Sequence, residues 1–470
     1  MSLRSHLLLS VIALGVMSAN VGHAQSNRDN DVVIDQIGRD NSAIITQSGQ
    51  VNLAGSELVK MVQDGIFNAL SISQTGLENT VGLSSPGLFQ FGRRNTTNIF
   101  NRIVIIQNSN SSAIGSVVQN SQGAVTNGAN TLSVTQQTGD RNRVNSVTQI
   151  QDAGEEGQTA QITMTGSDNF IDRVEQRSNA VGRDGENDIQ FNILGNNNGR
   201  IGLSGFAGEP LLADSSIVQE GDGTVDLGIY GNKVVLEIIG DDNRFGLRQG
   251  GRMNDMGRLL VNGNANQLGL RQDGAENNIQ MAVIEGDSNE IGIDQIVTNV
   301  ADVSLIGASD DNRIYAFQQG TNMLTARIEG DGNTWRSSQD YLSALGGVND
   351  AIFSLIGDDN FASLEQLGSN TFSLTITSDR NNTGGSLSGV AALGGLTAGN
   401  FTQRGAGNDM THTVAGSDNQ FAALQNGTNN FLTAVITGNS NQSSLVQNGV
   451  SNIAKLIQSG NGNTAGIYQN

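Results

Sequence analysis

The chain has 470 residues and a formal net charge of −20, from 25 basic and 45 acidic side chains. It is 36% hydrophobic, 4% aromatic and 15% charged, with 61 glycines, 2 prolines and no cysteine. So few bulky side chains exclude several conventional cores, and so little charge and proline argues against a disordered chain. The acidic balance argues against a nucleic-acid partner. The lack of cysteine excludes disulfides, thiolate metal sites and a cysteine nucleophile.

Positions 1–24 have the pattern of a secretory signal peptide. Arg4 precedes a short apolar run at residues 7–16, and a small–x–small triplet at residues 22–24 precedes the expected cleavage point. A buried N-terminal helix is the alternative. No stretch reaches the roughly 18 apolar residues that a membrane span needs. We therefore predict export with no membrane span, and a short segment at residues 25–31 before the repeats.

An 11-residue repeat runs from residue 32 to residue 470. At its start, Gln36, Gly38 and Asn41 are followed one period later by Gln47 and equivalent residues. In the middle the unit reads [Ile/Leu/Val]-x-Gly-x-x-Asn-x5-Gln and ends at Gln249, Gln272, Gln295 and Gln366, among others. The last units are the most regular and contain Gln425, Gln447, Gly449, Asn452, Gln458, Gly460, Asn463 and Gln469.

Each half-unit has the pattern of a strand followed by a turn. Leu432, Ala434 and Ile436 alternate with polar or small residues, which predicts a strand with one buried face. The Gly-x-x-Asn step predicts a sharp turn, because Gly and Asn tolerate a left-handed backbone. Irregular stretches, two of which contain the prolines, predict loop insertions around residues 82–88, 152–160, 185–215 and 381–400.

These patterns predict an all-β fold, a single long β-solenoid of about 18–20 two-strand coils. Each coil is a strand-arc-strand, 22-residue unit made of two 11-residue halves. Equivalent inward glutamines would stack about 4.8 Å apart as an amide ladder, so that the buried amides satisfy one another. Near Met164 and Ile193 the 11-residue spacing places Glu175 and Ser204 where a glutamine is expected.

The spacing resembles the curlin repeat of curli fibre subunits, S-x5-Q-x-G-x-x-N-x-A-x3-Q. Gln36, Gly38, Asn41, Ala43 and Gln47 match its second part, and the units that begin at Gln447 and Gln458 match it again. Partial versions cover most of residues 32–470. The resemblance implies a secreted amyloid subunit on the surface of a Gram-negative bacterium, associated with the outer membrane. It also implies outer-membrane secretion machinery, and copies of itself or related curlin-like subunits, as partners.

Neither end of the repeat shows a terminal amphipathic helix, and neither its first nor its last strand has a proline or lysine that would shield the strand edge. We therefore expect a structural subunit that polymerises through uncapped solenoid ends into a fibre for cell adhesion and the biofilm matrix. Acidic turns such as Gly240-Asp241-Asp242 and Gly357-Asp358-Asp359 would slow assembly by repulsion, or are simply solvated. The alternative function is a monomeric β-solenoid surface adhesin or carbohydrate-binding protein, which a cap, a cell-wall anchor or an aromatic strip would favour.

The sequence predicts no catalytic residue, metal site or cofactor, and hence no enzyme. His412 has no histidine or cysteine companion after the leader, and we expect it to be an exposed strand residue. The acidic pairs Glu155-Glu156 and Asp310-Asp311 lie in turns and do not converge. Gly-Asp turns are also found in calcium-binding β-rolls, but those have a nonapeptide repeat instead of the 11-residue unit of this chain. Trp335 and Phe245 are expected to fill the interior or cover an edge.

Overall fold

The computed structural model describes residues 20–21, 30–92, 100–121, 130–151, 158–178, 187–212, 216–219, 232–251, 254–274, 278–279, 281–299, 301–304, 310–340 and 348–470. The described chain is nearly all β, with two short 3-10 helices, η1 (Gly205–Gly208) and η2 (Gly389–Gly394). It separates into two compact units. The first contains Met1–Gly202 and Leu212–Val261, and the second contains Leu203–Leu211 and Asn262–Asn470. No helix among the described residues is long and apolar enough to cross a membrane.

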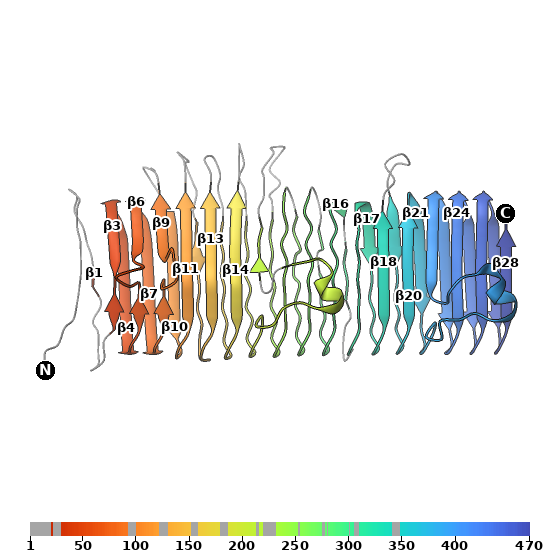
Figure 1. Cartoon of the computed structure of the whole chain (residues 1–470), viewed down its shortest axis with the longest axis horizontal. Coiled ribbons are helices and arrows are strands. Elements are labelled where there is room, and N and C mark those ends of the chain that lie inside the picture. Colours follow the sequence, from red (N-terminus) through yellow and green to blue (C-terminus); the bar gives the residue numbers. More distant parts are fainter. Residues whose placement is uncertain are drawn as a thin grey trace. The chain divides into compact units, whose positions relative to one another are not determined.

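The first unit contains parallel strands in two sheets (Figure 1). One sheet has the order β1 (Asn20–Val21), β4 (Ser42–Gln50), β7 (Asn68–Leu77), β10 (Phe100–Asn108) and β12 (Leu132–Ser133). The other contains β2 (Asp31–Val32), β3 (Ile34–Arg39), β5 (Leu53–Ala54), β6 (Met61–Ile66), β8 (Thr80–Val81), β9 (Leu88–Gly92), β11 (Ala113–Ser121), β13 (Arg143–Gln151), β14 (Phe170–Ser178) and β15 (Ser216–Ile217).

The second unit repeats this arrangement. One sheet has the order β16 (Val297–Asn299), β17 (Gly320–Thr325), β19 (Asn349–Ile352), β21 (Asn370–Ile376), β23 (Asn408–Ala415), β25 (Phe431–Thr437) and β27 (Ile453–Ser459). The other has the order β18 (Thr334–Asp340), β20 (Phe361–Leu367), β22 (Asn400–Ala406), β24 (Gln420–Thr428), β26 (Gln442–Val450) and β28 (Thr464–Gln469). From β17 onward, successive strands of this unit alternate between the two sheets, as a strand-arc-strand solenoid requires. The predicted all-β solenoid fold is therefore confirmed for each unit.

Strand alternation places the core between the two sheets of a unit. On β25, Leu432, Ala434 and Ile436 are buried, while Phe431 on the same strand remains 43% exposed. The facing strand β26 contributes the buried side chain of Leu445. The period-two pattern in the sequence thus identified the inward face correctly, because neighbouring side chains on a strand point to opposite sides.

Coil length is less uniform than the sequence suggests. A 22-residue step separates Gln425 from its partner Gln447, whereas a 27-residue step separates Gln36 from its partner Gln63. In the described first unit the coils stack Gln36, Gln63, Gln90, Gln119, Gln149, Gln176, Gln219 and Gln249. In the second they stack Gln272, Gln295, Gln318, Gln339, Gln366, Gln403, Gln425, Gln447 and Gln469. These seventeen positions are fewer than 18–20 because insertions lengthen many coils.

The insertions lie where coils turn. Pro86 is in the turn between β8 and β9, and Pro210 closely follows η1. Within the predicted insertion at 185–215, residues 187–202 continue the coil, since Ile189 and Ile193 are fully buried. The predicted insertion at 381–400 contains η2, and most of the one at 152–160 lies outside the described residues.

Most of the predicted signal peptide also lies outside the described residues. The exception is β1, whose Asn20 and Val21 pair in parallel with Ile44 and Ile45 of β4. Export and cleavage after Ala24 remain predictions from the sequence.

Candidate functional site

The most regular chemical feature of the second unit is a column of buried glutamines. From one side-chain Nε2 to the next Oε1 the distances are 2.7–2.9 Å along Gln339, Gln366, Gln403, Gln425, Gln447 and Gln469. Gln425 also donates to the carbonyl oxygens of Asp409 at 2.8 Å and Asn430 at 3.1 Å. An amide with no exposed surface is thus satisfied by its equivalents in neighbouring coils and by the backbone.

Comparable columns occur elsewhere in both units. In the first unit one column links Gln36, Gln63, Gln90, Gln119 and Gln149, another links Gln47, Gln74, Gln107 and Gln136, and a third links Gln176, Gln219 and Gln249. In the second unit Gln318 donates to Gln295, and Gln295 donates to Gln272. All but one of the glutamines singled out in the sequence therefore lie in an amide ladder.

Gln458 is the exception. It is buried on β27, but its neighbour on β25 is Ile436, and the next equivalent residue on β23 is Val414. Its Nε2 donates to the carbonyl oxygen of Gln442 at 3.0 Å. The neighbouring positions on this side of the second unit are aliphatic, so Gln458 has no glutamine on which to stack.

Two apparent gaps in the glutamine pattern are filled by other residues. The spacing placed Glu175 and Ser204 at ladder positions, and this is wrong. Gln176 pairs with Gln149, and Gln219 donates to Gln176 at 3.2 Å. The reason is local chain length. One extra residue precedes Gln176, and the insertion after Gly202 delays the next ladder residue to Gln219.

The repeat asparagines have a different role from the one assigned to them. The left-handed backbone belongs to the preceding residue, for example Asp40 with φ +59° and Ser451 with φ +58°. The asparagine side chain points inward and accepts hydrogen bonds from the next coil. Asn463 donates to Asn441 Oδ1 from both its backbone N–H and its Nδ2, each at 2.9 Å. Asn41 accepts the equivalent pair from Asn68 at 3.1 and 3.0 Å. These asparagines form a second ladder.

The repeat glycines near both ends of the repeat do have a left-handed backbone. Gly38, Gly449 and Gly460 have φ values of +102°, +97° and +100°. A Cβ on Gly38 would overlap the carbonyl oxygen of Gly65 in the next coil. The nearest atoms to a Cβ on Gly449 and Gly460 lie 3.7 and 3.6 Å away. The glycine is therefore required wherever another coil stacks upon it.

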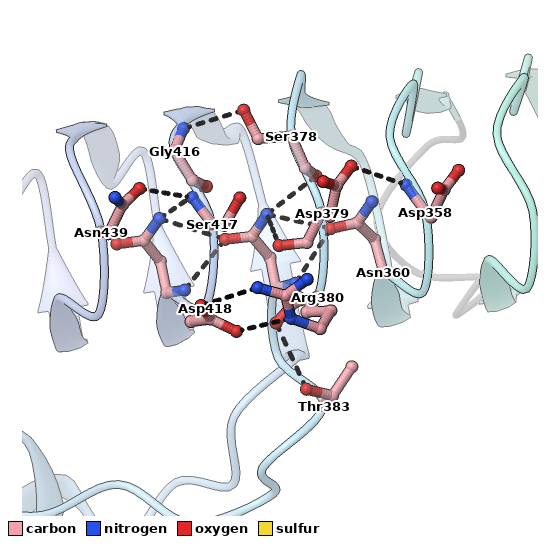
Figure 2. Close-up of polar contacts among 12 residues, drawn as sticks. Asp358, Asn360, Ser378, Asp379, Arg380, Thr383, Gly416, Ser417, Asp418 and Asn439 are labelled. Carbon is pink, nitrogen blue, oxygen red and sulfur yellow. Dashed lines mark hydrogen bonds and ion pairs between the residues drawn. The ribbon is translucent and has the colours of Figure 1, made fainter.

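The acidic turns form a third column, on the surface. Asp379 Oδ1 accepts the backbone N–H of Asp358 at 3.1 Å (Figure 2). Asp358 Oδ1 in turn accepts the backbone N–H of Asp331 at 2.9 Å. The same contact continues through Asp310, Asp287 and Asn264. The Asp241 side chain likewise accepts the N–H of Asn196. These carboxylates therefore cap backbone donors besides repelling one another.

We expect Asp358→Asn to preserve or raise stability, because asparagine keeps the acceptor and removes a stacked charge. Asp358→Ala should lower the free energy of unfolding by about 1 kcal/mol, since the Asp331 N–H loses its acceptor. Urea unfolding of both variants in low and high salt checks this. Any gain for asparagine should shrink in high salt. Equal behaviour of the two variants would show that the cap contributes nothing.

His412 is buried, so its prediction as an exposed strand residue is wrong. It is 1% exposed and shares the inward face of β23 with Met410. Its ring centroid lies 5.0 Å from that of Phe401 and 5.8 Å from that of Phe421. Neither ring nitrogen has a hydrogen-bond partner among the described residues. Burial lowers the pKa of His412 from 6.5 to about 3. Strand parity decided this placement, since inward residues alternate whatever their polarity.

This burial predicts a pH dependence of stability. Below pH 6.5 the unfolded chain takes up a proton that folded His412 refuses until about pH 3. The second unit should therefore lose stability as pH falls through this window, by up to about 1.4 kcal/mol per pH unit. His412→Phe should flatten that part of the curve. Urea midpoints at pH 7, 5 and 4 for both proteins measure it, and parallel curves would contradict it.

Other residues considered for chemistry do not converge. Asp310 belongs to the turn column, and Asp311 occupies the left-handed turn position with φ +56°. Glu155 and Glu156 lie outside the described residues. Trp335 and Phe245 are both fully buried. In the described ranges no group of three or more His, Cys, Asp or Glu side chains is placed to hold a metal ion.

No protein-family model matches the chain, and no curated protein matches it.

Proposed function

We propose that the chain is a secreted structural subunit of an extracellular curli-like amyloid fibre, which supports cell adhesion and the biofilm matrix. The observation that carries the proposal is the constant register from coil to coil. Gln425, Gln447 and Gln469 occupy equivalent positions on β24, β26 and β28, with side chains linked in series. In-register parallel strands with stacked amides are the pattern by which amyloid subunits add to one another.

The partner in this proposal is another copy of the chain or a related curlin-like subunit. In the described sheet orders, β28 has only β26 as a neighbour and β27 has only β25. An open parallel edge presents unpaired N–H and C=O groups that can template another chain. The resemblance to curlin repeats and the predicted leader support export through outer-membrane machinery to the surface of a Gram-negative cell.

Assembly of residues 25–470 after removal of denaturant tests the proposal. Thioflavin fluorescence should rise, and electron microscopy should show thin unbranched fibres. Fibre diffraction should give a meridional reflection near about 4.7 Å, the spacing of stacked strands. A β-rich monomer that stays soluble for days and ignores added seeds would overturn the proposal and favour a monomeric adhesin or carbohydrate-binding protein.

A further inference from the structure

Two distant segments of the second unit share a sequence and a conformation. Residues 203–207 read Leu-Ser-Gly-Phe-Ala and residues 387–391 read Leu-Ser-Gly-Val-Ala, and each pattern leads into a 3-10 helix. We call residues 203–211 strap 1 and residues 383–399 strap 2. In Figure 1, η2 of strap 2 lies across the strands near the C-terminus. It contacts β26 and β28.

Both straps are anchored in the same way. The backbone N–H and Oγ of Ser204 donate to Gln267 Oε1 at 2.6 and 3.1 Å. Those of Ser388 donate to Gln442 Oε1 at 2.6 and 2.8 Å. Gln267 and Gln442 each directly follow a ladder asparagine. The two straps are therefore bound by equivalent glutamines of different coils.

The glycine that lies beneath each strap, Gly292 or Gly466, is also at an equivalent position. A Cβ on Gly292 would lie 2.6 Å from the carbonyl oxygen of Phe206, and one on Gly466 would lie 2.6 Å from that of Val390. Both glycines are the third residue after a ladder asparagine. Phe206 and Val390 are the matching third positions of the strap motif after its leucine. The correspondence identifies Val390 as the counterpart of Phe206.

Strap 1 also contacts coils that follow the one containing Gln267. The Phe206 ring centroid lies 6.2 Å from that of Tyr315, and the Arg336 guanidinium lies 5.8 Å from the Phe206 ring. Glu209 of the strap is 3.9 Å from Arg336. Tyr315 is the third residue after Asn312, one coil beyond Gly292. The side chain at the strap tip thus packs on the coil that follows the glycine floor.

Strap 2 packs on the coil that contains Gly466, but it has no contact like that of Phe206 with Tyr315 among the described residues. Tyr468 donates through its hydroxyl to the carbonyl oxygen of Val390 at 2.9 Å. Val390 is 48% exposed and Leu393 is 75% exposed. Asn463 is the last ladder asparagine in residues 348–470, so no described coil takes the place that Tyr315 takes against strap 1.

We propose that the first coil of a second copy completes this contact, with its Val33 against Val390 and Leu393. The inference rests on the proposed end-to-end assembly and names the contact that sets its register. Strap 2 then bridges the joint between two copies as strap 1 bridges successive coils of one unit. Apolar side chains exposed on the strap become covered only in the fibre, which favours addition of a matching coil.

The ladders specify why Val33 is the contact. Asn30 Oδ1 accepts the backbone N–H of Asn52 at 2.8 Å, and Gln36 donates to Gln63 at 2.6 Å. The first coil therefore carries both ladder positions. If the ladders continue between copies, Asn30 stacks on Asn463 of the preceding copy. Val33, the third residue after Asn30, then takes the position of Tyr315.

Cysteine cross-linking tests the contact directly, because the chain has no cysteine. The double variant Val33→Cys and Val390→Cys should give disulfide-linked multimers on non-reducing gels after oxidation of fibres, and none from dilute monomer. The control pairs Val33→Cys with Leu211→Cys, because Leu211 is 88% exposed but lies on strap 1. Fibres in which the two double variants cross-link equally would overturn the contact.

A second measurement avoids cross-linking geometry. Leu393→Asp would bring an unpaired charge against an apolar partner and should slow seeded elongation about tenfold or more. Leu211→Asp is the matched control and should elongate as the unmodified chain does. Equal elongation of both variants would overturn the strap contact while leaving assembly intact. Failure of the unmodified chain to form fibres would instead overturn the proposed function.

Discussion

Replacing Gly427 with alanine is expected to destabilise the second unit by about 3–5 kcal/mol. Gly427 has φ +131°, and a Cβ there would overlap the carbonyl oxygen of Gly449. The two coils cannot separate locally, because Gln425 pairs with Gln447 on one side of the glycine and Thr428 pairs with Val450 on the other. The substitution therefore opens the ladder of β24 and β26 or forces the backbone out of its conformation.

Gly449→Ala is the matched control. Gly449 has the same motif position and φ +97°, but the nearest atom to its Cβ is 3.7 Å away. Only backbone strain remains, of about 1–2 kcal/mol. Urea midpoints of both variants measure the difference. Equal losses would mean that the contact between coils relaxes readily and that conformation alone requires glycine.

Gln425→Ala is expected to lower the free energy of unfolding by a similar amount, about 3–5 kcal/mol. The change removes the acceptor of Gln403 and the donor to Gln447. It also leaves the carbonyl oxygens of Asp409 and Asn430 without this donor. A cavity at a fully buried position adds to the lost hydrogen bonds.

Two further substitutions separate these contributions. Gln425→Leu fills the cavity and should recover part of the loss, since Val414 and Ile436 fill equivalent inward positions on the opposite sheet. Gln469→Ala alters the partly exposed last rung and should affect the unfolding midpoint little. If leucine destabilises as much as alanine, hydrogen bonds rather than volume determine the effect. If the alanine variant unfolds like the unmodified chain, the amide ladder does not stabilise the fold.

Residues that follow the local repeat were placed correctly from the sequence. Leu432 and Ile436 lie inside, and Gln425, Gln447 and Gln469 share one register. The reason is that inward and outward positions alternate along a strand, and a constant spacing brings equivalent positions together. No long-range information is needed for either inference.

Glu175 and His412 were misplaced from the sequence. The 11-residue spacing placed Glu175 at a ladder position. Gln176 occupies that position instead, because one additional residue precedes Gln176 in the chain. His412 was expected to be an exposed strand residue, yet it packs between Phe401 and Phe421. Counting parity from the inward Met410 and Val414 would have placed it correctly.

The straps were expected only as irregular insertions. Their shared Leu-Ser-Gly-x-Ala sequence is visible in the chain, as are Gly269, Gly292 and Gly466 at the third position after a ladder asparagine. Only the hydrogen bonds of Ser204 to Gln267 and of Ser388 to Gln442 show that the two straps dock in the same way. Each serine is far from its glutamine along the chain, so no local pattern connects them.

The sequence by itself determined the strands, the turns, the parallel stacking and the inward amides, since each follows from a short period repeated many times. Tertiary structure alone decided which residue fills each rung, that the asparagines point inward, that acidic turns cap the backbone of neighbouring coils, and where the straps dock. These features depend on how the residues of successive coils are aligned in the folded stack. Insertions change coil length without changing the local period, so only the folded stack specifies which residues meet.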